Sequence, residues 1–310
     1  MHVSVKATGR WLLDHPKVAG GLGILTFFWL VALIAPLVFP HPNAIGGAAL
    51  SDLPPSPLHW LGTTLTGQDV FQQTVVGARA SLSLGFGVGI VGTVLAALIG
   101  MTAGYAGGVV DDLLSLLINV FLVIPALPLA VVLSSYFVGA GTTPIFLVLI
   151  VTAWPYGARV FRAQTMSLRR REFVDSARSA GEPFWRLIFF EIFPNLIAVV
   201  ASGFIGVTIF AILADVGLEF IGLGDVTGTG WGTMLYWAQN SDALVQQMWW
   251  WFVAPGACVA LVGAGLSLVN FGIDELANPK LRNERPQKIR VRPTGELPQK
   301  PAGEQQEVVA

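Results

Sequence analysis

Apolar residues run without interruption over long stretches of this chain, and charged residues are confined to the gaps between them. About 20 apolar residues cross the roughly 30 Å of membrane hydrocarbon as a helix. The longest uncharged run, 113–158, is too long for one crossing, and the breakers Gly139 to Pro144 divide it. No Asp, Glu, Lys or Arg occurs in 18–51, 80–110, 113–158, 192–214 or 243–273. The pattern predicts six helices, near 18–39, 82–104, 113–138, 144–166, 194–222 and 251–273.

The composition gives the same class. Charged residues are 12% of the chain and hydrophobic residues 54%, whereas a soluble domain carries roughly 25% charged residues. An all-α integral membrane protein is therefore expected. The first apolar segment follows Lys6, Arg10 and Lys17 and could be a secretory signal. We favour a retained anchor, because its apolar core exceeds the about 7–15 residues of a signal.

Basic residues predict the orientation. If both termini lie in the cytoplasm, 17 of the 18 Lys and Arg residues are on the cytoplasmic side and only Arg79 is outside, as the positive-inside rule requires. The expected order is a cytoplasmic N-terminus (1–17), a first transmembrane helix (18–39), an external loop (40–79), a five-helix core (80–273) and a cytoplasmic, disordered tail (274–310). The location is the cytoplasmic membrane.

Several kinds of chemistry are disfavoured. A phosphate-binding loop needs a Gly-Lys pair, and none of the five lysines follows a glycine. The four histidines are scattered and Cys258 is the only cysteine, so no metal site is expected. A net charge of −1 gives no basic field for nucleic acid. With no nucleophile and base pair in view, the chain is not expected to be an enzyme by itself.

The segment 167–194, between the fourth and fifth predicted spans, has a pattern of its own. Its first part favours a helix with Phe173, Ala177 and Ala180 on one face. Gly181 can end that helix, and Pro183 fits the first turn of a second one. The segment either fixes topology and contacts anionic lipid through its arginines or forms a docking site.

This segment resembles the EAA loop of ATP-binding-cassette importer permeases. The family pattern is Glu-Ala-Ala, three residues, Gly, nine residues and Ile-x-Leu-Pro. Here it reads Asp175-Ser176-Ala177, three residues, Gly181, nine residues and Glu191-Ile192-Phe193-Pro194. Ala177, Gly181 and Pro194 match strictly; the other pattern positions are departures.

Further motifs, in the same order along the chain, are similar to the dipeptide/oligopeptide/nickel permeases within that family. They are His59-Trp60-Leu61-Gly62-Thr63, Gly67-Gln68-Asp69-Val70-Phe71, Gly77 to Leu82, Ala214 to Gly224, Trp231 to Leu235 and Gly272 to Pro279. One span followed by a long external loop resembles the C-type subunit of the heteromeric pair.

The resemblance implies a type I importer permease fold with a cytoplasmic coupling helix. Implied partners are a homologous B-type permease subunit, two cytoplasmic ATPase subunits or domains, an external substrate-binding protein and membrane lipid. ATP and Mg would be bound by the ATPases, and this chain would bind no cofactor. The residues expected to couple to the ATPases are Asp175, Ser176, Ala177, Arg178, Gly181, Phe184, Trp185 and Pro194.

The family carries di- and oligopeptides, nickel complexes, glutathione and sometimes oligosaccharides, so the implied function is ATP-driven import of a peptide or similar solute by alternating access. An ion-coupled secondary transporter is the main alternative; it would require broken helices and intramembrane ion ligands. An intramembrane enzyme is a weaker one.

A few residues within the spans are candidates for the translocation pathway. Pro125 and Pro128 can kink the third span, and Asn119 lies shortly before them, where the family tends to carry Asp. Asp215 and Glu219 share a helix face; we expect an interfacial pair reaching water, and an acidic lining that meets a cationic substrate group is the alternative. The glycines Gly85, Gly89, Gly100, Gly104, Gly107 and Gly108 are expected to allow close helix packing.

Overall fold

The computed structural model describes residues 15–277, so the calls on the N-terminal segment before His15 and on the tail after Ala277 lie outside it. Over the described range the chain forms a helical bundle with one isolated β-bridge, between Thr63 and Asp69. The elements are α2 (Pro16–Val38), η1 (Ala48–Leu50), α3 (Val70–Ala106), α4 (Gly108–Val123), α5 (Ala126–Ser135), α6 (Thr142–Leu168), α7 (Glu172–Ser179), α8 (Phe184–Arg186), the π-helical η2 (Leu187–Ile192), α9 (Phe193–Phe220), α10 (Trp231–Asn240) and α11 (Trp250–Ala277).

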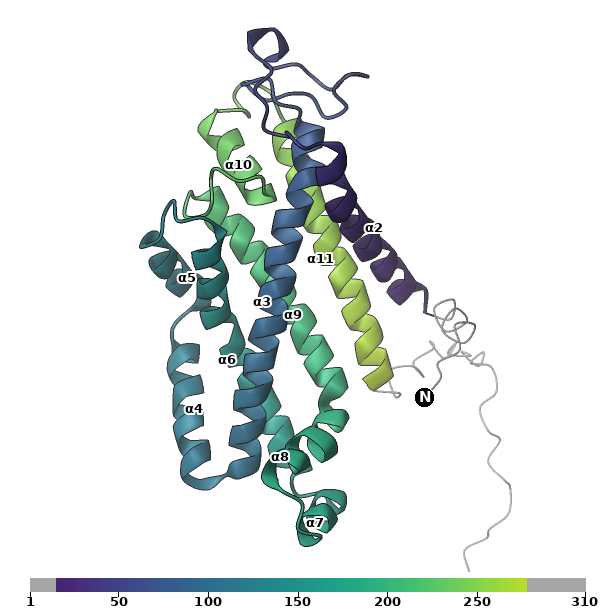
Figure 1. Cartoon of the computed structure of the whole chain (residues 1–310), viewed down its shortest axis with the longest axis vertical. Helices are drawn as coiled ribbons and strands as arrows, with labels where there is room; N and C mark the ends of the chain where they lie inside the picture. The colour runs from purple at the N-terminus through teal and green to yellow at the C-terminus, as the bar shows by residue number, and fades with distance from the viewer. Residues whose placement is uncertain (1–14, 278–310) are drawn as a thin grey trace, which may run out of the picture.

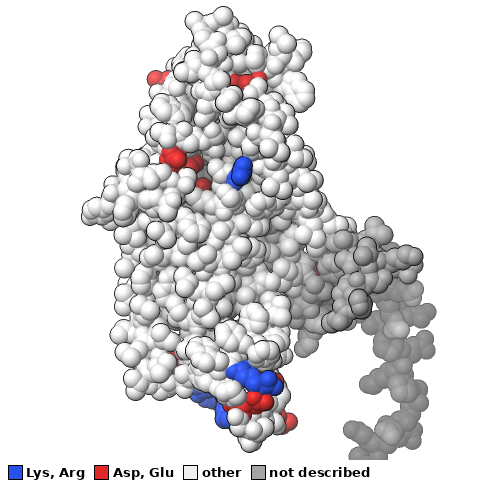
Figure 2. All heavy atoms as spheres, viewed as in Figure 1, with Lys and Arg blue, Asp and Glu red and all other residues white. Residues whose placement is uncertain are grey.

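Five helical stretches are long and apolar enough to cross a membrane: 16–38, 70–106, 142–168, 184–220 and 250–275. The pair α4 and α5 makes a sixth crossing if it is counted as one broken span. Figure 1 shows α7 and α8 at one end of the bundle, which we call the α7 end, and α10 with the 39–69 segment at the other, the α10 end. Charged side chains on the face shown in Figure 2 gather toward these two ends and leave an uncharged band between them. The all-α membrane prediction is confirmed, and the number of spans is six when α4 and α5 are counted together.

The third span differs from its prediction. A single helix over 113–138 was expected, but α4 and α5 meet at an angle of 81°. The break falls at Ile124 and Pro125, where proline removes a backbone donor and restricts the residue before it. The prediction of a kink at the prolines is therefore confirmed, whereas the prediction of one continuous helix over 113–138 is wrong.

The second span is longer than predicted. It begins at Val70 instead of near residue 82, because the Asp69 carboxylate accepts a hydrogen bond from the Gln72 amide (3.0 Å) and caps the helix. The external loop predicted over 40–79 therefore ends at Asp69. The loop predicted after the fifth span likewise contains a helix, α10, that was not expected.

Central helix α3 packs mainly against α6 and α9, and α2 packs against α11. Glycines make the close contacts possible: a Cβ at Gly100 would meet the Ala158 backbone of α6, and one at Gly89 would meet Thr208 of α9. Gly85 and Gly104 are packed in the same way against Ile212 and the Arg162 backbone, so helix packing is confirmed for all four positions. Gly107 and Gly108 instead form the turn between α3 and α4, with φ of 70° and 54°.

Candidate functional site

The connection between α6 and α9, residues 169–192, forms a defined turn at the α7 end; we call it the α7–α8 loop. Helix α7 ends in a Schellman motif in which the Gly181 amide donates to the Arg178 carbonyl (3.0 Å) and the Glu182 amide donates to the Ala177 carbonyl (3.2 Å). Gly181 has φ of +85°, where a residue without Cβ is unstrained. Pro183 then directly precedes α8. The helix–turn–helix expected from the sequence is confirmed.

An apolar side chain, Val174, packs α7 against the bundle. Val174 is fully buried and joins a cluster that includes Ile188, Ile192 and Leu196 of the following helical segment. The face that the sequence marked as apolar does not make this contact: Phe173 is 40% exposed and Ala180 is exposed beyond the helix end. Because η2 and α9 approach α7 from the side of Val174, that neighbouring face is the buried one.

Two arginines attach the loop to the end of α3. The Arg169 guanidinium donates to the carbonyls of Gly104 (3.2 Å) and Tyr105 (3.3 Å), which lie in the last turn of α3, where a cation is favoured. Arg178 donates to Asp175 (2.9 Å) and to the Tyr105 hydroxyl (3.4 Å). The hydrogen bond to Tyr105 raises the pKa of Arg178 above its ordinary value, so its side chain stays cationic. The arginines therefore hold the loop to α3, while Val174 holds it to α9.

The outer side of the loop combines charge with exposed aromatic surface. A groove of about 680 Å³ is lined by Tyr105, Asp175, Arg178 and Phe184, among others. Beside it the Trp185 side chain is 54% exposed and stacks on Phe189, with ring centroids 5.9 Å apart. Aromatic area with charges around it is the chemistry of a protein-docking surface.

The predicted site residues separate into four places, of which the acidic pair Asp215 and Glu219 is described next. Those at the groove or next to it are Asp175, Ser176, Ala177, Arg178, Gly181, Phe184 and Trp185. Pro194 is the second residue of α9 and does not line the groove. Asn119, Pro125 and Pro128 are exposed on or beside α4 and α5 and do not line the groove.

The acidic pair Asp215 and Glu219 corrects an expectation. A pair reaching water was expected, but the two residues are only 1% and 4% exposed. The Glu219 carboxylate accepts a hydrogen bond from the Thr233 amide (2.9 Å) in the first turn of α10. Glu219 therefore supplies the N-terminal cap of a helix that the sequence did not predict, which is why its burial could not be foreseen.

An ion pair between α4 and α6 was also missed. Arg162 donates through Nε and Nη2 to both carboxylate oxygens of Asp111, at 2.5 and 2.8 Å, and Ser115 donates to the same carboxylate at 3.0 Å. A bidentate pair of this kind fixes orientation as well as distance. The sequence carried a signal for it: acidic residues (Asp111, Asp112) border the third predicted span and basic residues (Arg159, Arg162) end the fourth, on the same side of the membrane.

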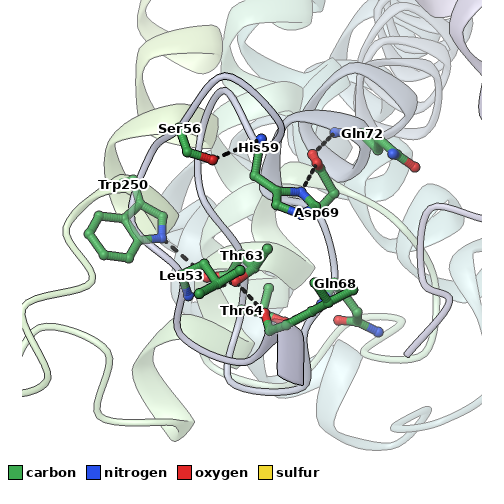
Figure 3. A network of polar contacts seen from close by, with 10 residues as sticks. Leu53, Ser56, His59, Thr63, Thr64, Gln68, Asp69, Gln72 and Trp250 are labelled. Atoms are coloured by element: carbon green, nitrogen blue, oxygen red, sulfur yellow. Dashed lines mark hydrogen bonds and ion pairs between the residues drawn. The ribbon is translucent and has the colours of Figure 1, made fainter. Parts of the chain in front are cut away.

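At the α10 end, the 39–69 segment is folded back onto the bundle by polar contacts (Figure 3). His59 Nδ1 lies 2.7 Å from Asp69 Oδ2, and the Trp250 indole donates to the Thr63 carbonyl at 3.2 Å. The Thr63 hydroxyl donates to the Leu50 carbonyl (2.6 Å) and accepts from the Leu53 amide (2.8 Å). The motif residues His59, Thr63 and Asp69 therefore have a structural role: they shape this segment and start α3.

Comparison with known proteins agrees with this architecture. Residues 96–283 match the family described as "Binding-protein-dependent transport system inner membrane component". The chain is 31% identical over 274 residues to the dipeptide transport system permease protein DppC of Bacillus subtilis, covering 88% of this chain and 85% of the relative.

Two further relatives show the same extent of similarity. A putative peptide permease protein of Brucella suis is 31% identical over 277 residues, covering 89% of this chain and 90% of the relative. The probable D,D-dipeptide transport system permease protein DdpC of Escherichia coli is 32% identical over 276 residues, covering 87% and 90%. The chain thus belongs to the binding-protein-dependent transport system inner membrane components, the membrane-spanning permease subunits of ATP-binding-cassette importers.

Proposed function

We propose that this chain is the translocating subunit of an ATP-driven importer for di- or oligopeptides, and that its α7–α8 loop is where a cytoplasmic ATPase binds. The carrying observation is that this loop is fixed to the bundle by Val174, Arg169 and Arg178 while it exposes Asp175 and Trp185. A rigidly attached surface of this kind can transmit motion of a bound ATPase to α3 and α9. The substrate class follows the three relatives named above, each of which is named as a peptide or dipeptide permease.

The complete importer would contain a homologous second permease, two ATPase subunits or domains and an external binding protein. ATP and Mg would be bound by the ATPases, since the sequence of this chain has no Gly-Lys pair for a phosphate-binding loop. Closure of the ATPases would move the α7–α8 loop and reopen the spans toward the opposite side of the membrane. Hydrolysis of ATP by this chain alone would contradict this assignment.

The α7 end is proposed to lie in the cytoplasm together with both termini. Several basic side chains make polar contacts at or near the α7–α8 loop, and Figure 2 shows basic side chains gathered there. They are Arg162, Arg169, Arg178 and Arg186. By the positive-inside rule, this basic end is expected on the cytoplasmic side. On a Cys258→Ala background, a membrane-impermeant thiol reagent added outside should label Ala49→Cys. It should not label Ser176→Cys until the membrane is permeabilised, and external labelling of Ser176→Cys would overturn the orientation.

Uptake by the reconstituted importer tests the function. Proteoliposomes holding both permeases and both ATPases, with binding protein added outside, should accumulate a radiolabelled dipeptide only when ATP is enclosed. The matched variant Asp175→Lys reverses a charge on the groove and should reduce uptake at equal protein levels. Uptake driven by an ion gradient without ATP would instead favour a secondary transporter and contradict the proposal.

A further inference from the structure

A small cavity near the α10 end contains a buried carboxylate with no partner. The cavity has a volume of about 300 Å³ and lies between α3, α6 and α9. Its lining residues include the acids Asp215 and Glu219 and the hydroxyl-bearing residues Ser83, Thr142 and Thr143. This volume is about ten times the share of one water molecule in liquid water, so the cavity has room for an organic group.

The two acidic residues differ in what they contact. Glu219 is occupied by the amide of Thr233, as described above. Asp215 is 1% exposed, and its Oδ1 has no hydrogen-bond partner. Neither acid forms an ion pair with a basic side chain of residues 15–277. A buried carboxylate without a partner is costly, and a cationic donor from outside this chain would remove that cost.

We propose that this cavity binds a primary ammonium group, with Asp215 as the counter-charge. An ammonium carries three N–H donors and no acceptor, and the residues that line the cavity carry acceptors: the unpaired Asp215 carboxylate and three hydroxyl-bearing side chains. The Ser83 hydroxyl donates its own proton to the Ala80 carbonyl (3.1 Å), which leaves its oxygen lone pairs available. Thr142 and Thr143 are exposed, so the cavity is open to solvent on their side.

The position of the cavity suits the binding of an imported solute. It lies at the α10 end, opposite the α7–α8 loop, where a solute delivered from outside would first meet the bundle. That use rests on the proposed function: the ammonium would be carried by the imported solute, as the free amino terminus of a peptide is. The binding site itself rests only on the buried carboxylate and its cavity.

Binding of [14C]methylammonium to the purified, complete importer in lipid nanodiscs tests the site without requiring transport. Wild type should bind the probe saturably. Tetramethylammonium chloride should displace the probe poorly, because this cation has the charge but no N–H donor. NaCl at the same ionic strength should also displace it poorly. Asp215→Asn should weaken binding at least tenfold, whereas the control Asp242→Asn, which removes an exposed charge at the same end, should bind like wild type.

Three results would overturn the inference. One is wild-type affinity in Asp215→Asn, which would mean that the carboxylate is only a structural group. Another is full displacement by NaCl, which would make this an alkali-ion site. The third is saturable binding that appears in Arg79→Gln but not in wild type. Arg79 directly precedes Ala80, which lines the cavity, so this result would mean that the Arg79 side chain itself fills the site in wild type. Failure of ATP-driven uptake with binding intact would instead refute the proposed function and leave the site standing.

Discussion

Truncation of Val174 should release α7 from the bundle without changing its outer surface. Val174 is fully buried in the cluster formed with η2 and α9. Val174→Ala removes two methyl groups, which at about 0.8 kcal/mol each gives a loss of about 1.6 kcal/mol before any cavity contribution. Since about 1.4 kcal/mol is a factor of ten, the undocked form of the loop should become about 15-fold more populated.

Amide hydrogen exchange over residues 172–188 measures this population directly. In Val174→Ala the protection of these amides should fall by about the same factor of 15, and ATPase binding should weaken with it. Phe173→Ala is the matched control, because Phe173 is the adjacent residue but is 40% exposed. It should leave exchange unchanged while reducing ATPase binding. Exchange in Val174→Ala within twofold of wild type would refute the claim that this side chain anchors α7.

Three other changes test separate parts of the structure. Gly181→Val should cost about 1–2 kcal/mol because of the φ of +85° and should reduce co-purification of the ATPase, whereas Gly181→Asn should be tolerated; equal co-purification with valine would contradict the turn's role. Arg162→Met should lower the free energy of unfolding by about 2–3 kcal/mol because Asp111 loses two charged hydrogen bonds, and adding Asp111→Asn should recover part of it in thermal melts; an unchanged melt would argue against the pair. Trp250→Phe should cost about 1 kcal/mol through loss of the bond to the Thr63 carbonyl, and proteolysis within 39–69 that is no faster than in wild type would count against that tether.

Local features of this fold could be read from the sequence, and features that depend on contacts between distant segments could not. The turn at Gly181 and Pro183 and the kink at Pro125 follow from the backbone chemistry of those residues, so both were predicted in place. The burial of Val174 instead of Phe173 depends on the direction from which η2 approaches. The burial of Glu219 depends on the Thr233 amide, which belongs to a helix that was not predicted. The signal for that helix was present, because Trp231, Met234 and Ala238 recur at helical spacing.

The start of α3 lies between these cases. The pair Asp69 and Gln72 has the spacing of a helix-capping motif, and the Asp69 side chain does cap the helix. The helix was nevertheless predicted to begin near residue 82, because Arg79 interrupts the uncharged run and its charge is exposed within the helix. A rule that weighs caps above single exposed charges would have placed this boundary correctly.

Cross-linking between the α7–α8 loop and an ATPase subunit tests the central claim most directly. Ser179 is exposed at the end of α7, so Ser179→Cys on a Cys258→Ala background places a reactive thiol at the proposed interface. In the assembled importer a short bifunctional reagent should join this position to the ATPase, and the control Ala49→Cys at the α10 end should give no such product. An intact, transporting complex in which Ser179→Cys never cross-links to the ATPase, under conditions where another position does, would contradict the account.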